Sequence, residues 1–129
     1  MQCYSGSCHC KSVRFEIDGL IERVVECNCS ICCKKGALHH AIEAGSFRLL
    51  CGQERLGTYS FGTGEAKHHF CTVCGIHVFA RPRGAPDLYS VNVRTLDDFS
   101  IQPGSPEVVQ FDGQHWEESI ARLQRKGAQ

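Results

Sequence analysis

Hydrophobic side chains alternate with polar ones over several short stretches of this chain. The first clear alternation places Val13, Phe15 and Ile17 between charged neighbours. A period of two is typical of a strand with one buried face. Cys8 and Cys10 stand shortly before this stretch, so they are expected to lead into the first strand.

Similar short runs follow, separated by turn residues. They predict extended segments over 20–26, 37–41 and 47–52, from Val78 onward and over 89–93, with turns at 97–99 and at Asp112-Gly113. Helical periodicity appears only over 116–125, where Trp116, Ile120 and Leu123 share one side. The pattern predicts a mainly β fold of short, twisted antiparallel sheets with turn-rich connections and a short C-terminal helix.

Length and charge narrow the class of protein. The 129 residues are predicted to form a single domain over 1–129, and 42% hydrophobic with 22% charged residues is typical of a globular chain. Lys and Arg number 14, as do Asp and Glu. This balance disfavours nucleic acid or an anionic membrane as a partner, because both attract clustered basic residues.

Ten cysteines are the most unusual feature of the composition. The N-terminal residues do not resemble a signal peptide and no long apolar stretch is present, so a cytoplasmic location is expected. Cysteines stay reduced there, and close spacings then indicate metal binding more often than disulfides. A C-x-C pair is also difficult to bridge within itself, because disulfide geometry is specific.

Seven cysteines stand at spacings suited to chelation: Cys8 and Cys10, Cys27, Cys29 and Cys32, and Cys71 and Cys74. Structural zinc sites use four ligands, whereas catalytic sites use three and leave one position to water or substrate. The two separated pairs are therefore predicted to form a closed zinc site that stabilises the domain. The central trio is predicted to form a second, open zinc site. Gly75 follows the last pair and suits a tight turn around a metal.

Whether a protein ligand closes the second site is left open by the sequence. The candidates for a fourth ligand are Cys33, Cys51, His39, His40, His68 and His69. Cys33 directly follows Cys32, so its side chain is expected to point away from a metal bound there. For the histidines, a structural role on the surface or in a strand is the simpler interpretation.

An all-sulfur open site has a chemical preference. Three thiolates on one Zn²⁺ leave the site with a net negative charge. This charge makes the metal a weaker Lewis acid toward water, whereas a further soft thiol ligand suits it. A substrate thiol that coordinated there would lose its proton. Lys34 and Lys35 follow the cluster and are candidate counter-charges, although a solvated basic turn explains them equally well.

The ordered motifs resemble the glutathione-dependent formaldehyde-activating enzyme family, also called the centromere protein V domain. They are Gly6-Ser7-Cys8-His9-Cys10, Val13-Arg14-Phe15, Cys27-x-Cys29-Ser30-x-Cys32, Phe70-Cys71-x-x-Cys74-Gly75 and Val91-Asn92-Val93-Arg94, spread over about 4–117. The resemblance implies a β-rich fold with the two zinc sites above. It also implies a carbon-sulfur lyase activity that joins glutathione and formaldehyde in S-(hydroxymethyl)glutathione. Ile76-His77 departs from the small hydroxyl residue often found there.

Two other functions remain open at this stage. A non-catalytic zinc module would carry glutathione or bind another protein. A redox sensor would use Cys32-Cys33 or the Cys71–Cys74 pair. Fold-level likeness alone does not decide among these functions, because one fold hosts many activities.

Overall fold

The structure, a computed structural model, describes residues 3–85, 87–97 and 106–127. Its strands are β1 Cys3–Ser7, β2 Arg14–Asp18, β3 Arg23–Cys27, β4 His39–Glu43, β5 Phe47–Cys51, β6 Leu56–Tyr59, β7 Lys67–Cys71, β8 His77–Arg81, β9 Leu88–Asn92 and β10 Glu107–Phe111. The α-helices are α1 Ser30–Lys35 and α2 Trp116–Gly127. Short 3-10 turns are η1 Ala44–Ser46, η2 Gln53–Arg55, η3 Val93–Thr95 and η4 Gly113–His115.

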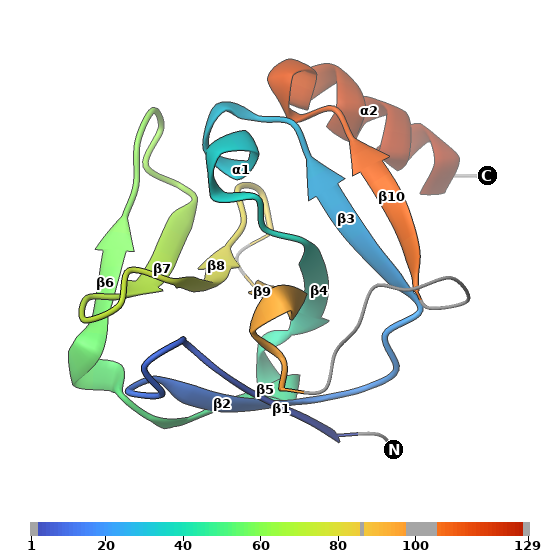
Figure 1. Cartoon of the computed structure of the whole chain (residues 1–129). Coiled ribbons are helices and arrows are strands. Elements are labelled where there is room, and N and C mark those ends of the chain that lie inside the picture. Colours follow the sequence, from blue (N-terminus) through green and yellow to red (C-terminus); the bar gives the residue numbers. More distant parts are fainter. Residues whose placement is uncertain (1–2, 86, 98–105, 128–129) are drawn as a thin grey trace.

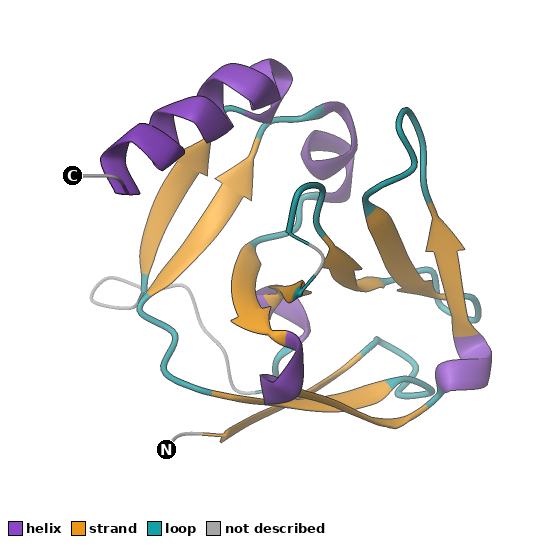
Figure 2. Ribbon diagram, turned by 180° about the vertical axis from the view of Figure 1, so that it is seen from behind, coloured by secondary structure: helices purple, strands orange, loops and turns teal. Residues whose placement is uncertain are grey.

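The strands form two sheets. The smaller has the order β1-β2-β5 and lies along the base of the view in Figure 1, whereas the larger has the order β10-β3-β4-β9-β8-β7-β6 and curves above it. Helix α2 lies along the β3–β10 pair, as the view from behind also shows (Figure 2). The predicted mainly β fold with a short C-terminal helix is confirmed.

One strand pair departs from the expected antiparallel arrangement. Strand β10 runs parallel to β3, with Glu107 opposite Arg23 and Phe111 opposite Cys27. Parallel neighbours need a long connection, and here most of the chain lies between the two strands. The pairing brings the segment that follows β10 beside the end of β3, where the second cysteine cluster begins.

The core lies between the two sheets. Val13, Phe15 and Ile17 are buried as their alternation predicts. Phe47 from the small sheet packs between Phe15, at a ring-centroid distance of 5.5 Å, and Phe79 of the large sheet, at 4.6 Å. The same core includes Cys8 and Cys71, each from one of the two pairs expected to form the closed site. That site is therefore anchored in the main core.

Gly6 shows how closely the two sheets approach each other. A Cβ atom at this position would lie 2.4 Å from the ring of Phe15 and 2.7 Å from the carbonyl oxygen of Thr95. Because the carbonyl oxygen of Thr95 belongs to the backbone, a rotamer change cannot make room for a Cβ atom. Gly6 is thus required by packing, just before the first cysteine pair.

Several predicted boundaries differ from the structure. Cys8 and Cys10 do not enter a strand; they lie in the loop that joins β1 to β2, and β1 itself was not predicted. The strand predicted over 20–26 begins only at Arg23, because Leu20 is 62% exposed. Of the turn predicted over 97–99, residues 98 and 99 lie outside the described residues.

The helices also refine the predictions. The expected basic turn after Cys32 is the last turn of α1, which ends at Gly36 with a φ of 66°. Helix α2 starts at Trp116 as predicted, but Leu123, which was expected on the apolar side of the helix, is 54% exposed. Within the described ranges, no helix is long and apolar enough to span a bilayer.

Candidate metal centres

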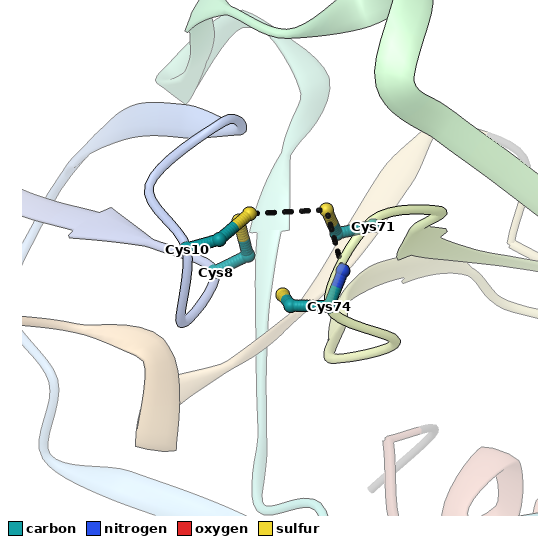
Figure 3. Close-up of side chains that lie close together, drawn as sticks. All are labelled: Cys8, Cys10, Cys71 and Cys74. Carbon is teal, nitrogen blue, oxygen red and sulfur yellow. Dashed lines mark hydrogen bonds between the residues drawn. The ribbon is translucent and has the colours of Figure 1, made fainter.

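The first cysteine cluster joins two distant loops. Cys8 and Cys10 come from the β1–β2 loop, Cys71 ends β7, and Cys74 lies in the turn before β8. Their four sulfur atoms lie within 4.8 Å of one another and face a common centre (Figure 3). The Cys10 sulfur is 3.7 Å from those of Cys8 and Cys71. The structure thus brings together all four residues predicted for the closed site.

These distances suit a tetrahedral zinc ion. With Zn–S bonds of about 2.3 Å, adjacent sulfurs of a tetrahedron lie about 3.8 Å apart. The observed separations of 3.7 Å are close to that value. Four thiols are also the ligand set that structural zinc prefers. The residues present therefore fit a zinc ion.

Backbone amides support the sulfurs. The N–H of Val13 donates to Cys8 Sγ at 3.4 Å, and the N–H groups of Val73 and Cys74 donate to Cys71 Sγ at 3.4 and 3.5 Å. The turn closes at Gly75, whose φ of 79° favours glycine. Hydrogen bonds of this kind stabilise a thiolate and orient it toward a metal.

The electrostatics of this cluster favour a bound cation. Burial raises the pKa of Cys8 to about 11, a change that the amide of Val13 opposes and the neighbouring thiols reinforce. Four adjacent thiols, of which Cys8 and Cys71 are buried in the core, do not readily ionise together, because each thiolate disfavours the next. A divalent ion would remove that penalty and make metal binding part of folding.

The second cluster lies where β3 meets α1. Cys27 ends β3, Cys29 is the N-cap of α1, and Cys32 lies in the helix. Their sulfurs also lie within 4.8 Å of one another. The amide of Cys29 donates to Cys27 Sγ at 3.5 Å, and that of Cys32 donates to Cys29 Sγ at 3.4 Å. Helix capping and the C-x-C-x-x-C spacing together bring the three thiols to one point.

A segment from the far end of the chain covers this cluster. The backbone of Gly113 hydrogen-bonds Cys27, and a Cβ atom on Gly113 would lie 2.5 Å from Cys27 Sγ. Asn28 ties the loop to the same segment, donating to Asp112 at 3.0 Å and accepting from the amide of Gln114 at 3.0 Å. Gly113 is a site residue that the sequence indicated only as part of a turn.

The thiols of this cluster share protons unequally. Contact with Cys32 lowers the pKa of Cys27 to about 6, against the opposing effect of burial. Contact with Cys27 and burial raise the pKa of Cys32 far above its usual value. One thiol is therefore readily ionised while its neighbour holds a proton. A metal would have to displace that proton to gain all three sulfurs.

None of the six candidate fourth ligands joins the three sulfurs within the described part of the chain. His39 Nε2 lies within hydrogen-bonding distance of Cys32 Sγ, at 3.4 Å, but this nitrogen is not grouped with all three sulfurs. Cys33 is exposed, as expected from its position after Cys32. Cys51 lies near the first cluster, beside the carbonyl oxygen of Ser12 at 3.8 Å.

The remaining candidate histidines lie on strands. His40 is half-buried on β4, and His69 on β7 contacts Thr58 Oγ1 at 3.0 Å. His68, also on β7, is buried and lies 2.8 Å from Lys35 Nζ. The two lysines after the cluster thus differ: Lys34 is exposed, whereas Lys35 turns inward.

Two cavities flank α1. One, of about 170 Å³, is lined by Cys27, Cys32 and Cys33 among others, so it opens directly onto the three-thiol cluster. The other, of about 440 Å³, is lined by residues that include Lys35, His68 and His77. The sequence analysis gave His77 no role. In the fold it is buried on β8 and pairs with Phe70 of β7.

Taken together, the fold and the two clusters define a cysteine-rich β domain with one set of four thiols and one set of three thiols beside a cavity, each of which could hold a metal ion. The family model described as glutathione-dependent formaldehyde-activating enzyme matches residues 3–116. The chain belongs to this family.

A solved structure supports the same placement. A crystal structure of a Rhodobacter sphaeroides protein is 33% identical in sequence, with a TM-score of 0.72. The match covers 81% of this chain and 98% of that one. The similarity supports the fold and the family but adds no substrate.

Substitutions should separate the roles of the two clusters. C71S removes a ligand that is wholly buried in the core, so we expect the chain to lose cooperative folding. C29S should leave the protein folded with one fewer zinc ion per chain. Metal analysis with circular dichroism measures both effects, and C33S serves as the exposed control. A stably folded C71S with unchanged zinc content would contradict the assignment.

Gly113 offers a test outside the cysteines. In G113A the new methyl group meets Cys27 Sγ and the Cβ atom of Cys29, so we expect the second cluster to open and bind zinc about tenfold or more weakly. The first cluster should keep its metal. Competition with a chromophoric chelator measures both affinities. G45A is the matched control, because nothing lies within 4 Å of a Cβ atom there. Equal zinc affinities in both variants would show that Gly113 does not support the cluster.

Proposed function

We propose that this protein is a zinc-dependent enzyme that adds a thiol, glutathione in particular, to formaldehyde or a related small aldehyde. The observation that carries the proposal is the three-thiol cluster beside a cavity, without a fourth protein ligand among the described residues. Family membership supports the same reaction. In its reverse direction the reaction is that of a carbon-sulfur lyase.

The chemistry requires one new bond and one proton transfer. The thiol sulfur attacks the aldehyde carbon, a C–S bond forms, and the carbonyl π electrons move to oxygen. The proton lost by the thiol ends on that oxygen, giving an S-hydroxymethyl adduct. No oxidant or reductant is needed. The task of the site is therefore to ionise the thiol and to place both reactants together.

The protein contributes the ligands and their support. Cys27, Cys29 and Cys32 would hold a zinc ion, which on binding supplies a site where a substrate thiol is deprotonated by coordination. Amides of Cys29, Cys32 and Gly113 stabilise the protein thiolates. The adjoining cavity of about 170 Å³ has room for a one-carbon aldehyde, since a water molecule occupies only about 30 Å³ in the liquid.

The first cluster has a separate role in this proposal. Cys8, Cys10, Cys71 and Cys74 would hold a second zinc ion that has no position left for a substrate. This ion would fix the β1–β2 loop to the β7–β8 turn and serve stability alone. We also propose a cytoplasmic location, where reduced glutathione is available and thiols remain free; all ten cysteines are free in the structure.

Kinetics with the zinc-loaded protein test the proposed activity. We expect adduct formation from glutathione and ¹³C-labelled formaldehyde, followed by NMR, to exceed the uncatalysed rate by about tenfold or more. C32S should fall to background, whereas C3S should remain active, because Cys3 is an exposed residue of β1 that belongs to neither cysteine cluster and lines neither cavity. Saturable glutathione binding with no acceleration at any thiol concentration would indicate a carrier and contradict the enzymatic proposal.

A further inference from the structure

Lys35 is a partly buried cation on α1. Its ammonium nitrogen lies 2.8 Å from His68 Nδ1 and 3.4 Å from His77 Nε2, at the wall of the cavity of about 440 Å³. His68 and His77 are 8% and 9% exposed. Burial lowers the pKa of His68 to about 4, so this imidazole is neutral and accepts a hydrogen bond from the ammonium. Burial lowers the pKa of His77 as well.

The group formed by Lys35, His68 and His77 contains no negatively charged side chain. No acidic residue lines this cavity, and no ion pair involves Lys35 within the described residues. Buried cations in proteins are normally paired with an anion, because desolvation without a partner is costly. An ammonium carries three N–H groups, and the two imidazoles use only two of them. The third can bind an anionic ligand.

The three-thiol cluster is the rival partner for this charge. Burial lowers the pKa of Lys35 to about 8. The charges of Cys32 and Cys29 act in the opposite direction and raise this pKa, so the ammonium interacts electrostatically with both thiolates. However, the hydrogen bonds of Lys35 in the described structure go to His68 and His77, which lie on the cavity side. The position of Lys35 therefore suits a ligand that enters this cavity, three residues along α1 from Cys32.

The remaining walls indicate an organic ligand. The cavity falls within the range of about 300–1,000 Å³ that is typical of small-molecule sites. Ile31, Tyr59 and Phe70 supply apolar surface, and Phe61 stacks between Tyr59 and His68 at ring-centroid distances of 5.8 Å on each side. An inorganic ion would leave this apolar surface without a contact.

We infer that the cavity binds the carboxylate-bearing part of the thiol substrate, and that Lys35 binds its carboxylate. The inference rests on the proposed function and narrows its substrate to an acidic thiol. His68 and His77 act as positioning residues, because they hold the ammonium at the cavity wall. Lys34 has no part in this site, since it is exposed on the same helix.

Calorimetric titration of the zinc-loaded protein tests the inference without an activity assay. The probes are glutathione and its diethyl ester, which keeps the thiol but lacks both carboxylates. We expect K35M to bind glutathione about tenfold or more weakly than wild type. K34M, the matched control, should bind within about twofold of wild type, as surface substitutions usually have small effects. The ester should bind wild type weakly and show no further loss in K35M.

Three results would overturn the inference. Equal glutathione affinity of K35M and wild type would exclude Lys35 as the anchor and leave the proposed function intact. Loss of zinc from K35M would show that Lys35 serves the metal cluster instead. Failure of wild type to bind glutathione at all would overturn this inference and the proposed function together. Comparing acid and ester on the wild type keeps the test decisive even if K35M does not fold.

Discussion

The structure depends on bringing together four thiols that would repel one another once ionised, two of them in the core. Cys8 and Cys71 are buried among the side chains that join the two sheets, and their sulfur atoms lie within 4.8 Å of those of Cys10 and Cys74. Without a cation, ionising one of them disfavours ionising the others. With a divalent ion, the same contacts stabilise the fold and connect residues that are far apart in sequence. Metal binding and folding are then a single process.

The three-thiol cluster is assembled differently from the four-thiol cluster. Its sulfurs come from one short stretch, Cys27 to Cys32, which a strand end and a helix cap can shape locally. Its cover comes from elsewhere: the parallel pairing of β10 with β3 places Gly113 against Cys27. The cluster therefore has a locally formed ligand set and a cover that forms only with the whole fold. On the other side of α1, Lys35 and two histidines connect the cluster to a larger cavity.

Local patterns in the sequence predicted much of this arrangement. Chelating spacings indicated both cysteine groups, and two-residue alternation located β2 and β9 within one residue at each end. Features that depend on distant contacts were missed. The parallel strand β10, the role of Gly113 and the burial of His77 all follow from which segments meet in space, and a single sequence carries little information about that. The short helix α1 was taken for a turn because six residues show too little periodicity.

Anomalous diffraction at the zinc absorption edge tests the account most directly. Crystals of the reduced protein should show two peaks per chain. One peak should be enclosed by the sulfurs of Cys8, Cys10, Cys71 and Cys74. The other should be bound by Cys27, Cys29 and Cys32, with its fourth ligand a water molecule or an added thiol. A single peak, or a second ion enclosed by four protein ligands, would contradict an open site and the chemistry built on it.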